Sequence, residues 1–443
     1  MKFQVLFVCF FCLYGYSFGL PVDVNGDPVY SQPEQIHISA TGDVTEMIIT
    51  WVTFAANVDS IVEYGLADEA LSLKASGAAT KFTDGGSEHR VMYIHRVKLT
   101  GLKPATSYDY HCGSMLGWSS VIRFKTLPAG TDWSPRLCLY GDLGNANAMS
   151  LGYIQEELTR DDFDAILHVG DFAYNMATDN ARVGDAFMNQ IVPIASVRPY
   201  MTCPGNHEYA YNFSNYRNRF SMPGDSEGLF YSWNIGPMHI ISISTEIYFD
   251  FLKDGVRLLD HQYDWLVNDL EKATSAESRK AQPWILVMGH RPMYCSDNDG
   301  DDCTKENSVV RVGVTTSHLY PLESLLYKYG VDLLVWAHEH NYERLYPIYN
   351  QKVLNGSKDA PFTNPGAPVH VITGSGGCSE RHDPFKKDPA YFTAFRSLDY
   401  GYTRMTVYNS THLYMDQVSV DQAGKVIDEM WLIKEKHGPY NYI

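Results

Sequence analysis

Five short apolar runs in this chain each end in a polar signature with side chains that can bind metal ions. The runs RLCLY, AILHV, YMTCP, WILVM and VDLLVWA are followed by GDLG, GDFAY, GNHE, GHRP and HEH. These signatures carry carboxylate, phenol, amide and imidazole groups on Asp142, Asp171, Tyr174, Asn206, His290, His338 and His340. Such a mixture packs poorly in a core but suits hard or borderline cations. The seven residues therefore predict a site for two metal ions.

The apolar runs predict how these side chains are brought together. Each run has the length and apolarity of a strand buried in a sheet. Each signature follows the carboxyl end of its strand, where open α/β sheets usually place their ligand sites. His338 and His340 are separated by one residue, so an extended chain would point both to the same side. His168 lies inside the run AILHV, and we expect it either in the core or behind the ligands as a supporting residue.

Tyr174 indicates which metal the site prefers. Its phenol titrates near pH ~10, so only a strongly Lewis-acidic cation displaces the proton at ordinary pH. Ferric iron does so readily, and a phenolate bound to ferric iron gives a visible charge-transfer colour. Tyr174 therefore favours ferric iron and predicts a coloured protein.

The charge balance restricts the partners. The chain has 443 residues, with 35 Lys and Arg against 52 Asp and Glu, a formal charge of -17. This acidic surface repels nucleic acid and anionic membranes, so we expect neither as a partner. An anionic small molecule would need local positive charge, which buried metal ions can supply.

The N-terminal residues predict export from the cytosol. Residues 1–19 combine Lys2, an apolar stretch and small residues, as a signal peptide does. No later segment has about 18 uninterrupted apolar residues, so we expect no membrane span. We expect a protein that is secreted or that resides in a lumenal compartment such as the lysosome. Three sequons, at Asn212, Asn355 and Asn409, are glycosylation candidates wherever they are exposed.

The cysteines fit the same compartment. Cys295 and Cys303 bracket a loop short enough to be closed by a disulfide. Sequence cannot establish the pairing of the remaining four cysteines of the mature chain, Cys112, Cys138, Cys203 and Cys378. Cys138 lies in an apolar run and could equally be a buried free thiol.

Two domains are expected after the signal. Residues 32–128 are typical of an all-β fibronectin type III-like sandwich, with Trp51 in the core and a tyrosine corner from the pair Tyr108 and Tyr110. A Pro- and Gly-containing boundary follows. From residue 134 to 435, strands alternate with amphipathic helices, which predicts a layered α/β/β/α domain. Residues 402–420 return to strand alternation and predict a hairpin in this second domain.

The five signatures in this order resemble those of the purple acid phosphatases, in the calcineurin-like metallophosphoesterase superfamily. The resemblance is to the two-domain form and covers nearly all of the mature chain, including a C-terminal extension that contains FRSLDYGYTRMTVYN. It implies a ferric ion held by Asp142, Asp171, Tyr174 and His340. It also implies a divalent ion (iron, zinc or manganese) held by Asp171, Asn206, His290 and His338. Asp171 would bridge the two.

The implied activity is that of a secreted acid phosphatase, in which metal-bound hydroxide attacks a small phosphate monoester. His207, next to Asn206, would point elsewhere in an extended segment, which favours a proton donor or a phosphate contact. A phosphodiesterase or nucleotide hydrolase on the same site is the nearest alternative. A secreted binding protein with an inactive catalytic domain is another.

The chain departs from the family at two places. Ala337 stands where the family often has glycine before the last two histidines, and an ordinary backbone torsion would tolerate it. Plant-like members carry phosphate-contacting histidines after the GH signature, whereas residues 293–307 here read MYCSDNDGDDCTKEN. The identity of the leaving-group acid therefore stays open. The charge of this acidic stretch could select cationic or small substrates, but we interpret the stretch as a solvated face.

Overall fold

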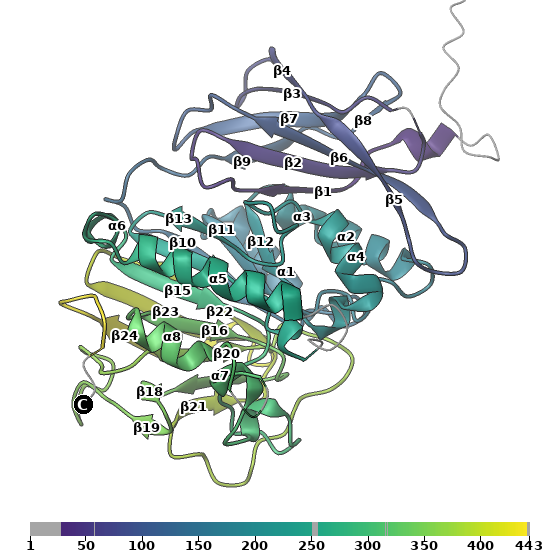
Figure 1. The fold of residues 1–443 in the computed structure, drawn as a ribbon. Helices are drawn as coiled ribbons and strands as arrows, with labels where there is room; N and C mark the ends of the chain where they lie inside the picture. Colours follow the sequence, from purple (N-terminus) through teal and green to yellow (C-terminus); the bar gives the residue numbers. More distant parts are fainter. Residues whose placement is uncertain (1–27, 57, 250–255, 315, 317, 441–443) are drawn as a thin grey trace, which may run out of the picture.

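The N-terminal domain is a sandwich of two antiparallel sheets (Figure 1). The computed structural model describes residues 28–56, 58–249, 256–314, 316 and 318–440, so the expected signal peptide lies outside the described residues. One sheet has the order β1 (Glu34–Ser39), β2 (Met47–Thr53), β6 (Val91–Leu99) and β5 (Ala78–Thr83). The other contains β4 (Leu73–Ser76), β3 (Ile61–Leu66), β7 (Ser107–Ser114) and β8 (Gly117–Trp118), with β9 (Ile122–Lys125) also paired to β7.

Aromatic residues form the centre of this sandwich, as expected for a fibronectin type III-like domain. Trp51 is fully buried between the sheets. The Tyr108 hydroxyl accepts a hydrogen bond of 2.9 Å from the backbone N–H of Lys103, which closes the turn before β7. This is the tyrosine corner that the sequence predicts.

The second domain contains two large sheets packed face to face. The six-stranded sheet has the order β12 (Tyr200–Cys203), β11 (Ala165–Val169), β10 (Arg136–Tyr140), β22 (Gly401–Val407), β23 (His412–Ser419) and β24 (Lys425–Ile433). Its first three strands are parallel to one another, and β22 pairs antiparallel with β10. The hairpin expected from the C-terminal alternation is therefore β22–β23, and it extends this sheet.

The seven-stranded sheet has the order β13 (Tyr231–Ile235), β14 (Met238–Ser242), β15 (Trp284–Met288), β16 (Leu333–Trp336), β20 (Val369–Thr373), β17 (Tyr342–Leu345) and β21 (Thr393–Ser397). Strands β14, β15, β16 and β20 run parallel. All residues of β15 and β16 are buried, because the sheet is covered on both faces. A separate ribbon pairs β18 (Ile348–Tyr349) with β19 (Lys352–Val353).

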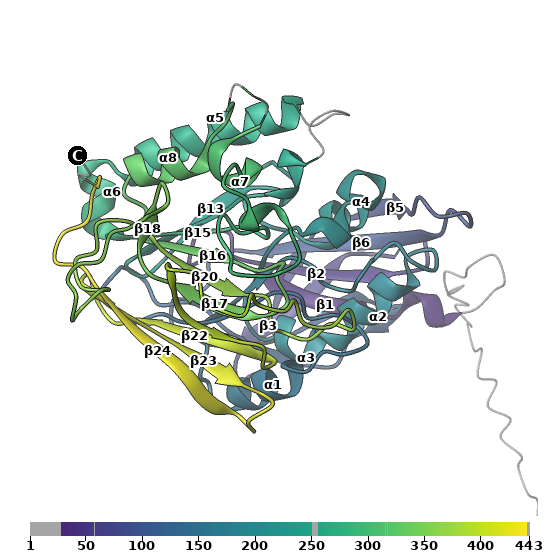
Figure 2. The same cartoon turned by 90° about the horizontal axis from the view of Figure 1, so that it is seen from below.

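Helices cover the outer faces of the two sheets, which gives the expected α/β/β/α layers (Figure 2). The helices α5 (Val256–Ala273) and α8 (Leu322–Lys328) lie over the seven-stranded sheet, and α1 (Leu151–Thr159) lies on the far side of the six-stranded sheet. Helix α5 buries Leu259, Leu266 and Leu270, which share one face at helical spacing. The other α-helices of the described residues are α2 (Arg182–Gln190), α3 (Val192–Ala195), α4 (Ala210–Arg219), α6 (Ala276–Ala281) and α7 (Val309–Val312).

Polar contacts join the two domains. The Tyr110 hydroxyl donates to the carbonyl of Ser196 at 2.9 Å. The buried guanidinium of Arg219 donates to Gln35 at 2.7 Å and to Asp185 at 2.9 Å. Because Arg219 is fully buried, its charge requires this Asp185 partner. Among the described residues, no helix is both long and apolar enough to cross a membrane.

Candidate metal centre

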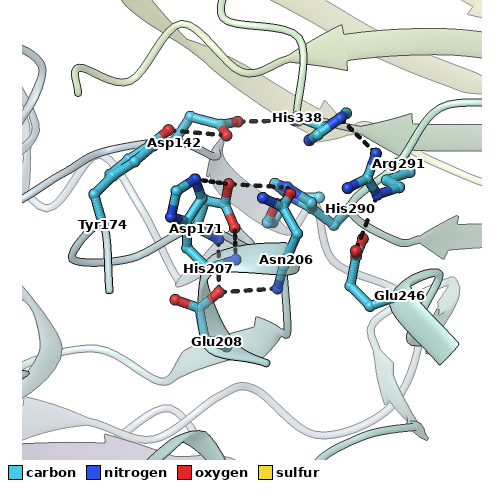
Figure 3. A network of polar contacts seen from close by, with 12 residues as sticks. Asp142, Asp171, Tyr174, Asn206, His207, Glu208, Glu246, His290, Arg291 and His338 are labelled. Carbon is cyan, nitrogen blue, oxygen red and sulfur yellow. Dashed lines mark hydrogen bonds and ion pairs between the residues drawn. The ribbon is translucent and has the colours of Figure 1, made fainter. Parts of the chain in front are cut away.

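The five signatures meet where the two sheets of the second domain face each other. Strands β10, β11 and β12 of the six-stranded sheet lead to Asp142, to Asp171 with Tyr174, and to Asn206. Strands β15 and β16 of the seven-stranded sheet lead to His290 and to the pair His338 and His340. One sheet thus supplies the oxygen donors and the other supplies the nitrogen donors (Figure 3).

Asp171, Asn206 and His290 form one group. His290 Nε2 lies 3.1 Å from Asn206 Oδ1 and 3.2 Å from Asp171 Oδ2. Possible ligand atoms of Asp171, His290 and His338 all lie within 4.8 Å of one another. Asp171 and His290 are almost completely buried, so a cation here would be shielded from solvent.

Asp142, Tyr174 and His340 form the second group. The Tyr174 hydroxyl lies 2.8 Å from His340 Nε2 and 3.2 Å from Asp142 Oδ1. The backbone N–H of His338 donates to Asp142 Oδ2 at 2.9 Å, so Asp142 contacts the bend that carries both histidines. The phenol, the carboxylate and the imidazole of this group therefore point at one place.

The outer nitrogen of each histidine has its own hydrogen-bond acceptor. His290 Nδ1 donates to the carbonyl of Val169 at 2.9 Å, and His340 Nδ1 donates to that of Arg381 at 2.8 Å. His338 Nε2 lies 2.6 Å from Asp301 Oδ2 and 2.8 Å from Arg291 Nη1, and its proton goes to Asp301 because a guanidinium cannot accept one. A neutral imidazole with one protonated nitrogen keeps the other as a lone pair. Nε2 of His290, Nε2 of His340 and Nδ1 of His338 are therefore available to a metal ion.

The electrostatics of the centre fit a bound cation. Burial and the charge of Asp171 raise the pKa of the Asp142 carboxyl well above its usual value. Burial, and then the charge of Asp142, raise the pKa of the Tyr174 phenol well above its usual value. Although burial opposes it, the adjacent Asp171 raises the pKa of His290 to about 10. A buried carboxylate that lacks a cationic partner keeps a proton, and a metal ion can take the place of that proton. The residues present therefore fit a metal centre.

Strained backbone positions hold several of these side chains. Asp142, Asp171, Tyr174 and His338 all have positive φ, at 56°, 50°, 53° and 71°. Non-glycine residues adopt such torsions at a cost of order 1–3 kcal/mol each, which the surrounding structure must offset. Gly170 also has positive φ, and a Cβ there would lie 2.4 Å from His290 Nδ1. Glycine at this position leaves room for the imidazole.

The extended backbone expected at the histidines is wrong. His338 lies in a bend with left-handed torsion, because its N–H turns toward Asp142. Asn206 and His207 are also not extended, since Asn206–Glu208 form a 3-10 turn, η2. His207 lies at the rim, with Nδ1 3.0 Å from Asn175 Oδ1 and Nε2 3.8 Å from Asp171 Oδ2. It is thus close to the centre but outside the two groups.

Three family models match successive parts of the chain. They describe a purple acid phosphatase N-terminal domain (residues 33–126), a calcineurin-like phosphoesterase (135–342) and an iron/zinc purple acid phosphatase-like C-terminal region (367–429). Acid phosphatase type 7 of Danio rerio is 57% identical over 415 residues, covering 93% of this chain and 94% of its own. Its Homo sapiens counterpart is 51% identical, covering 98% of each.

The chain belongs to the purple acid phosphatase family. A purple acid phosphatase from yellow lupin seeds has the same fold, with a TM-score of 0.76 at 25% identity over 91% of this chain and 75% of the lupin chain. This chain is therefore an acid phosphatase that hydrolyses phosphate esters. The alternative of a non-catalytic binding protein is set aside.

Ala337, where the purple acid phosphatases often have glycine, is accommodated without strain. Its backbone torsion is not in the left-handed region, and its side chain is fully buried. A Cβ on Gly141 would lie 2.4 Å from the Ala337 methyl. Because glycine has no Cβ, the end of β10 can lie close to the end of β16. The methyl of Ala337 is therefore tolerated.

The acidic stretch after GHRP is not simply a solvated face, contrary to our expectation. Asp297 and Asp302 are buried, and Asp302 accepts a hydrogen bond from Ser308 Oγ at 2.6 Å. Asp301 contacts His338. The exposed residues of the stretch are Asn298, Asp299, Gly300, Lys305, Glu306 and Asn307. Spacing alone does not predict this, because the disulfide between Cys295 and Cys303 folds the loop back onto the site.

Glu208 is a supporting residue that the sequence reasoning missed. Its buried carboxylate accepts hydrogen bonds from the backbone N–H groups of Asp171 (2.9 Å), Phe172 (3.1 Å) and Gly205 (2.9 Å). Burial, and then the charge of Asp171, raise its pKa to about 8. Glu208 thus joins the turns after β11 and β12. Glu208 is the last residue of the signature GNHE, and this position could have indicated a role near the site.

The predicted glycosylation sites lie outside the two groups of candidate ligands, whereas Cys378 borders the centre. Asn212, Asn355 and Asn409 are exposed, as glycosylation requires. Cys112, Cys138, Cys203 and Cys378 are buried free thiols. Cys378 Sγ lies 3.4 Å from His340 Nδ1. His168 is buried among aromatic rings, including Phe172 at 4.3 Å.

Proposed function

We propose that this acid phosphatase hydrolyses small phosphate monoesters at a dinuclear centre of ferric iron and a divalent metal. The proposal rests on one observation above all, the placement of the Tyr174 hydroxyl 2.8 Å from His340 and 3.2 Å from Asp142. A phenol between an imidazole and a carboxylate is a suitable ligand set for ferric iron.

The seven inferred ligands divide into two sets. Asp142, Tyr174 and His340 would hold ferric iron. Asn206, His290 and His338 would hold divalent iron, zinc or manganese, and Asp171 would contact both ions. When bound, the two cations neutralise phosphate oxygens and lower the pKa of a water molecule.

The protein residues position the ester and handle its protons. The carboxylates of Asp142 and Asp171, which are almost completely buried, would hold the cations. His207 is a partly exposed donor at the rim, with Glu380 Oε2 3.6 Å from its Nε2. In its protonated form it stabilises the transferring phosphoryl group or donates to the leaving oxygen.

We also propose that the protein is secreted or lumenal. The apolar N-terminal segment, the exposed sequons and the Cys295–Cys303 disulfide support this location. Expression in a secretory host tests it: we expect a mature chain that starts after Gly19 and loses mass with a glycosidase. An intact Met1 in the secreted product would contradict the signal assignment.

Colour tests the proposed metal centre. Purified iron-loaded protein should be pink to violet, and Tyr174→Phe should lose this band while keeping its fold. Tyr211→Phe, at an exposed position, is the matched control and should keep the colour. A colourless wild-type protein that contains iron would contradict the assignment of Tyr174.

The phosphodiesterase alternative is tested with paired substrates. We expect p-nitrophenyl phosphate to be hydrolysed with a higher kcat/KM than bis(p-nitrophenyl) phosphate by the same preparation. The reverse order would replace the monoesterase proposal by a diesterase.

A further inference from the structure

Asp301 lies at the end of the loop that the Cys295–Cys303 disulfide closes, and it contacts His338. Asp301 Oδ2 lies 2.6 Å from His338 Nε2, and the side chain of Asp301 is 28% exposed. Arg291 Nη1 lies 2.8 Å from the same nitrogen, so Nε2 has a carboxylate and a guanidinium beside it. An ionised carboxylate only accepts hydrogen bonds. Nε2 therefore donates to Asp301, its nearer neighbour, when it carries the proton, and Arg291 then donates to Asp301 as well. Nδ1 of His338 is thereby left with its lone pair toward the centre.

Asp301 is itself held in place from two sides. Arg291 Nη1 donates to Asp301 Oδ2 at 3.1 Å, and Arg291 Nε donates to the buried Glu246 at 2.9 Å (the latter pair is labelled in Figure 3). The backbone N–H of Arg291 is bonded to Thr245 Oγ1 at 2.8 Å. The disulfide restricts the loop from its two ends. The carboxylate therefore has little freedom to leave His338.

The three histidines of the centre differ in how their outer nitrogens are bonded. His290 donates to the backbone carbonyl of Val169, and His340 donates to that of Arg381. His338 Nε2 instead has two charged side chains beside it, Asp301 of the acidic loop at 2.6 Å and Arg291 at 2.8 Å. A carboxylate that accepts from a metal-binding imidazole fixes its tautomer and orientation and makes it a stronger donor.

We propose that Asp301 is the positioning residue of His338 and thereby sets the affinity of the centre for its divalent metal. The inference rests on the proposed function, because it assigns a role toward the divalent ion of that centre. The acidic loop would thus support binding of the divalent metal, through His338. The ferric side does not depend on it, because His340 is bonded to a backbone carbonyl.

The experiment compares Asp301→Asn and Asp301→Ala with the matched control Asp299→Asn. Asp299 is exposed in the same loop, and its Oδ1 accepts the N–H of Asp301, a bond that an asparagine oxygen keeps. Iron-loaded protein is titrated with Zn²⁺ or Mn²⁺, and the bound metal is measured by mass spectrometry. The visible band and the thermal unfolding temperature are recorded for each variant.

We expect a 10- to 100-fold weaker affinity for the divalent metal in the Asp301 variants, about the loss usual for such partners. Asp301→Ala should lose most, because it lacks any acceptor. The visible band should persist, and excess divalent metal should restore kcat. Asp299→Asn should match the wild type in all readouts.

Three results would overturn the inference. These are divalent affinity within twofold of wild type in both Asp301 variants, an equal loss in Asp299→Asn, and a simultaneous loss of the visible band. The last would mean that Asp301 supports the whole site rather than His338. If Asp301→Ala unfolds, the isosteric Asp301→Asn still decides the question. A wild-type protein that binds iron but no divalent metal would instead refute the dinuclear centre of the proposed function.

Discussion

The two sheets of the second domain contribute different chemistry to the same site. The six-stranded sheet presents carboxylate, phenol and amide groups on tight turns with left-handed residues, joined from behind by Glu208. The seven-stranded sheet presents three imidazoles, each oriented by a hydrogen bond at its outer nitrogen. Backbone conformation thus holds most of the oxygen side, whereas individual hydrogen bonds orient the nitrogen side, where His338 alone of the three imidazoles also has a left-handed torsion. Changes on the oxygen side should therefore affect the whole site, and changes on the nitrogen side should affect one metal.

Removal of the shared oxygen ligand should have the largest effect. Asp171→Asn removes the charge that both ions need, and metal ions contribute several kcal/mol to the transition state. We expect kcat to fall by at least about a thousandfold, since each 1.4 kcal/mol is a factor of about ten. Steady-state kinetics and metal analysis check this. Retention of both metals with less than a tenfold loss would contradict the bridging role.

The nitrogen side should separate the two metals. His340→Gln should lose iron and the visible band, because His340 contacts Tyr174. His338→Gln should keep the band and lose the divalent metal. Both should reduce kcat by about a hundredfold or more. Metal analysis of the two variants side by side is the test, and identical losses would show that the halves are not separable.

Metal removal should make the stability depend strongly on pH. Glu208 and His290 have raised pKa values in the metal-free fold, about 8 and about 10. Below the unfolded values, 4.5 and 6.5, the stability that each contributes is fully present, and it is lost as pH rises toward the folded value. The apoprotein should therefore lose a few kcal/mol between pH 5 and pH 9, since one pKa unit is about 1.4 kcal/mol.

Thermal unfolding at pH 5, 7 and 9 measures this difference. The metal-loaded protein should show a smaller slope, because cations replace the protons. Equal slopes for both forms would mean that the buried carboxylates and His290 do not carry the pH dependence.

Replacement of the support behind the oxygen side should have the smallest effect. Glu208→Gln keeps one acceptor oxygen but removes the charge that accepts three backbone N–H groups. We expect a loss of about 1–3 kcal/mol in the free energy of unfolding. Denaturant unfolding of the apoprotein and the metal-loaded protein checks it. A variant as stable as the wild type would show that the turns after β11 and β12 are stable without the charge of Glu208.

Much of the fold could be predicted from local patterns. The runs before GDLG, GDFAY and GHRP are the strands β10, β11 and β15, because a mainly apolar run of five residues suits a strand covered on both faces. Trp51 and Tyr108 could be placed in the sandwich because their roles depend on nearby residues of the same turns and strands. The bend at His338 could not be predicted in this way, since the backbone N–H of His338 bonds to Asp142, which follows a strand of the other sheet.

The sequence by itself determined the set of chemical groups available to this protein, from the carboxylates and phenol to the three histidines, and the strands that carry them. Only the tertiary structure decided that oxygen donors come from one sheet and nitrogen donors from the other, and that Asp301 reaches His338. The physical reason is that apolar periodicity reports burial along one strand. It says nothing of which sheets face each other or where a disulfide-closed loop folds back.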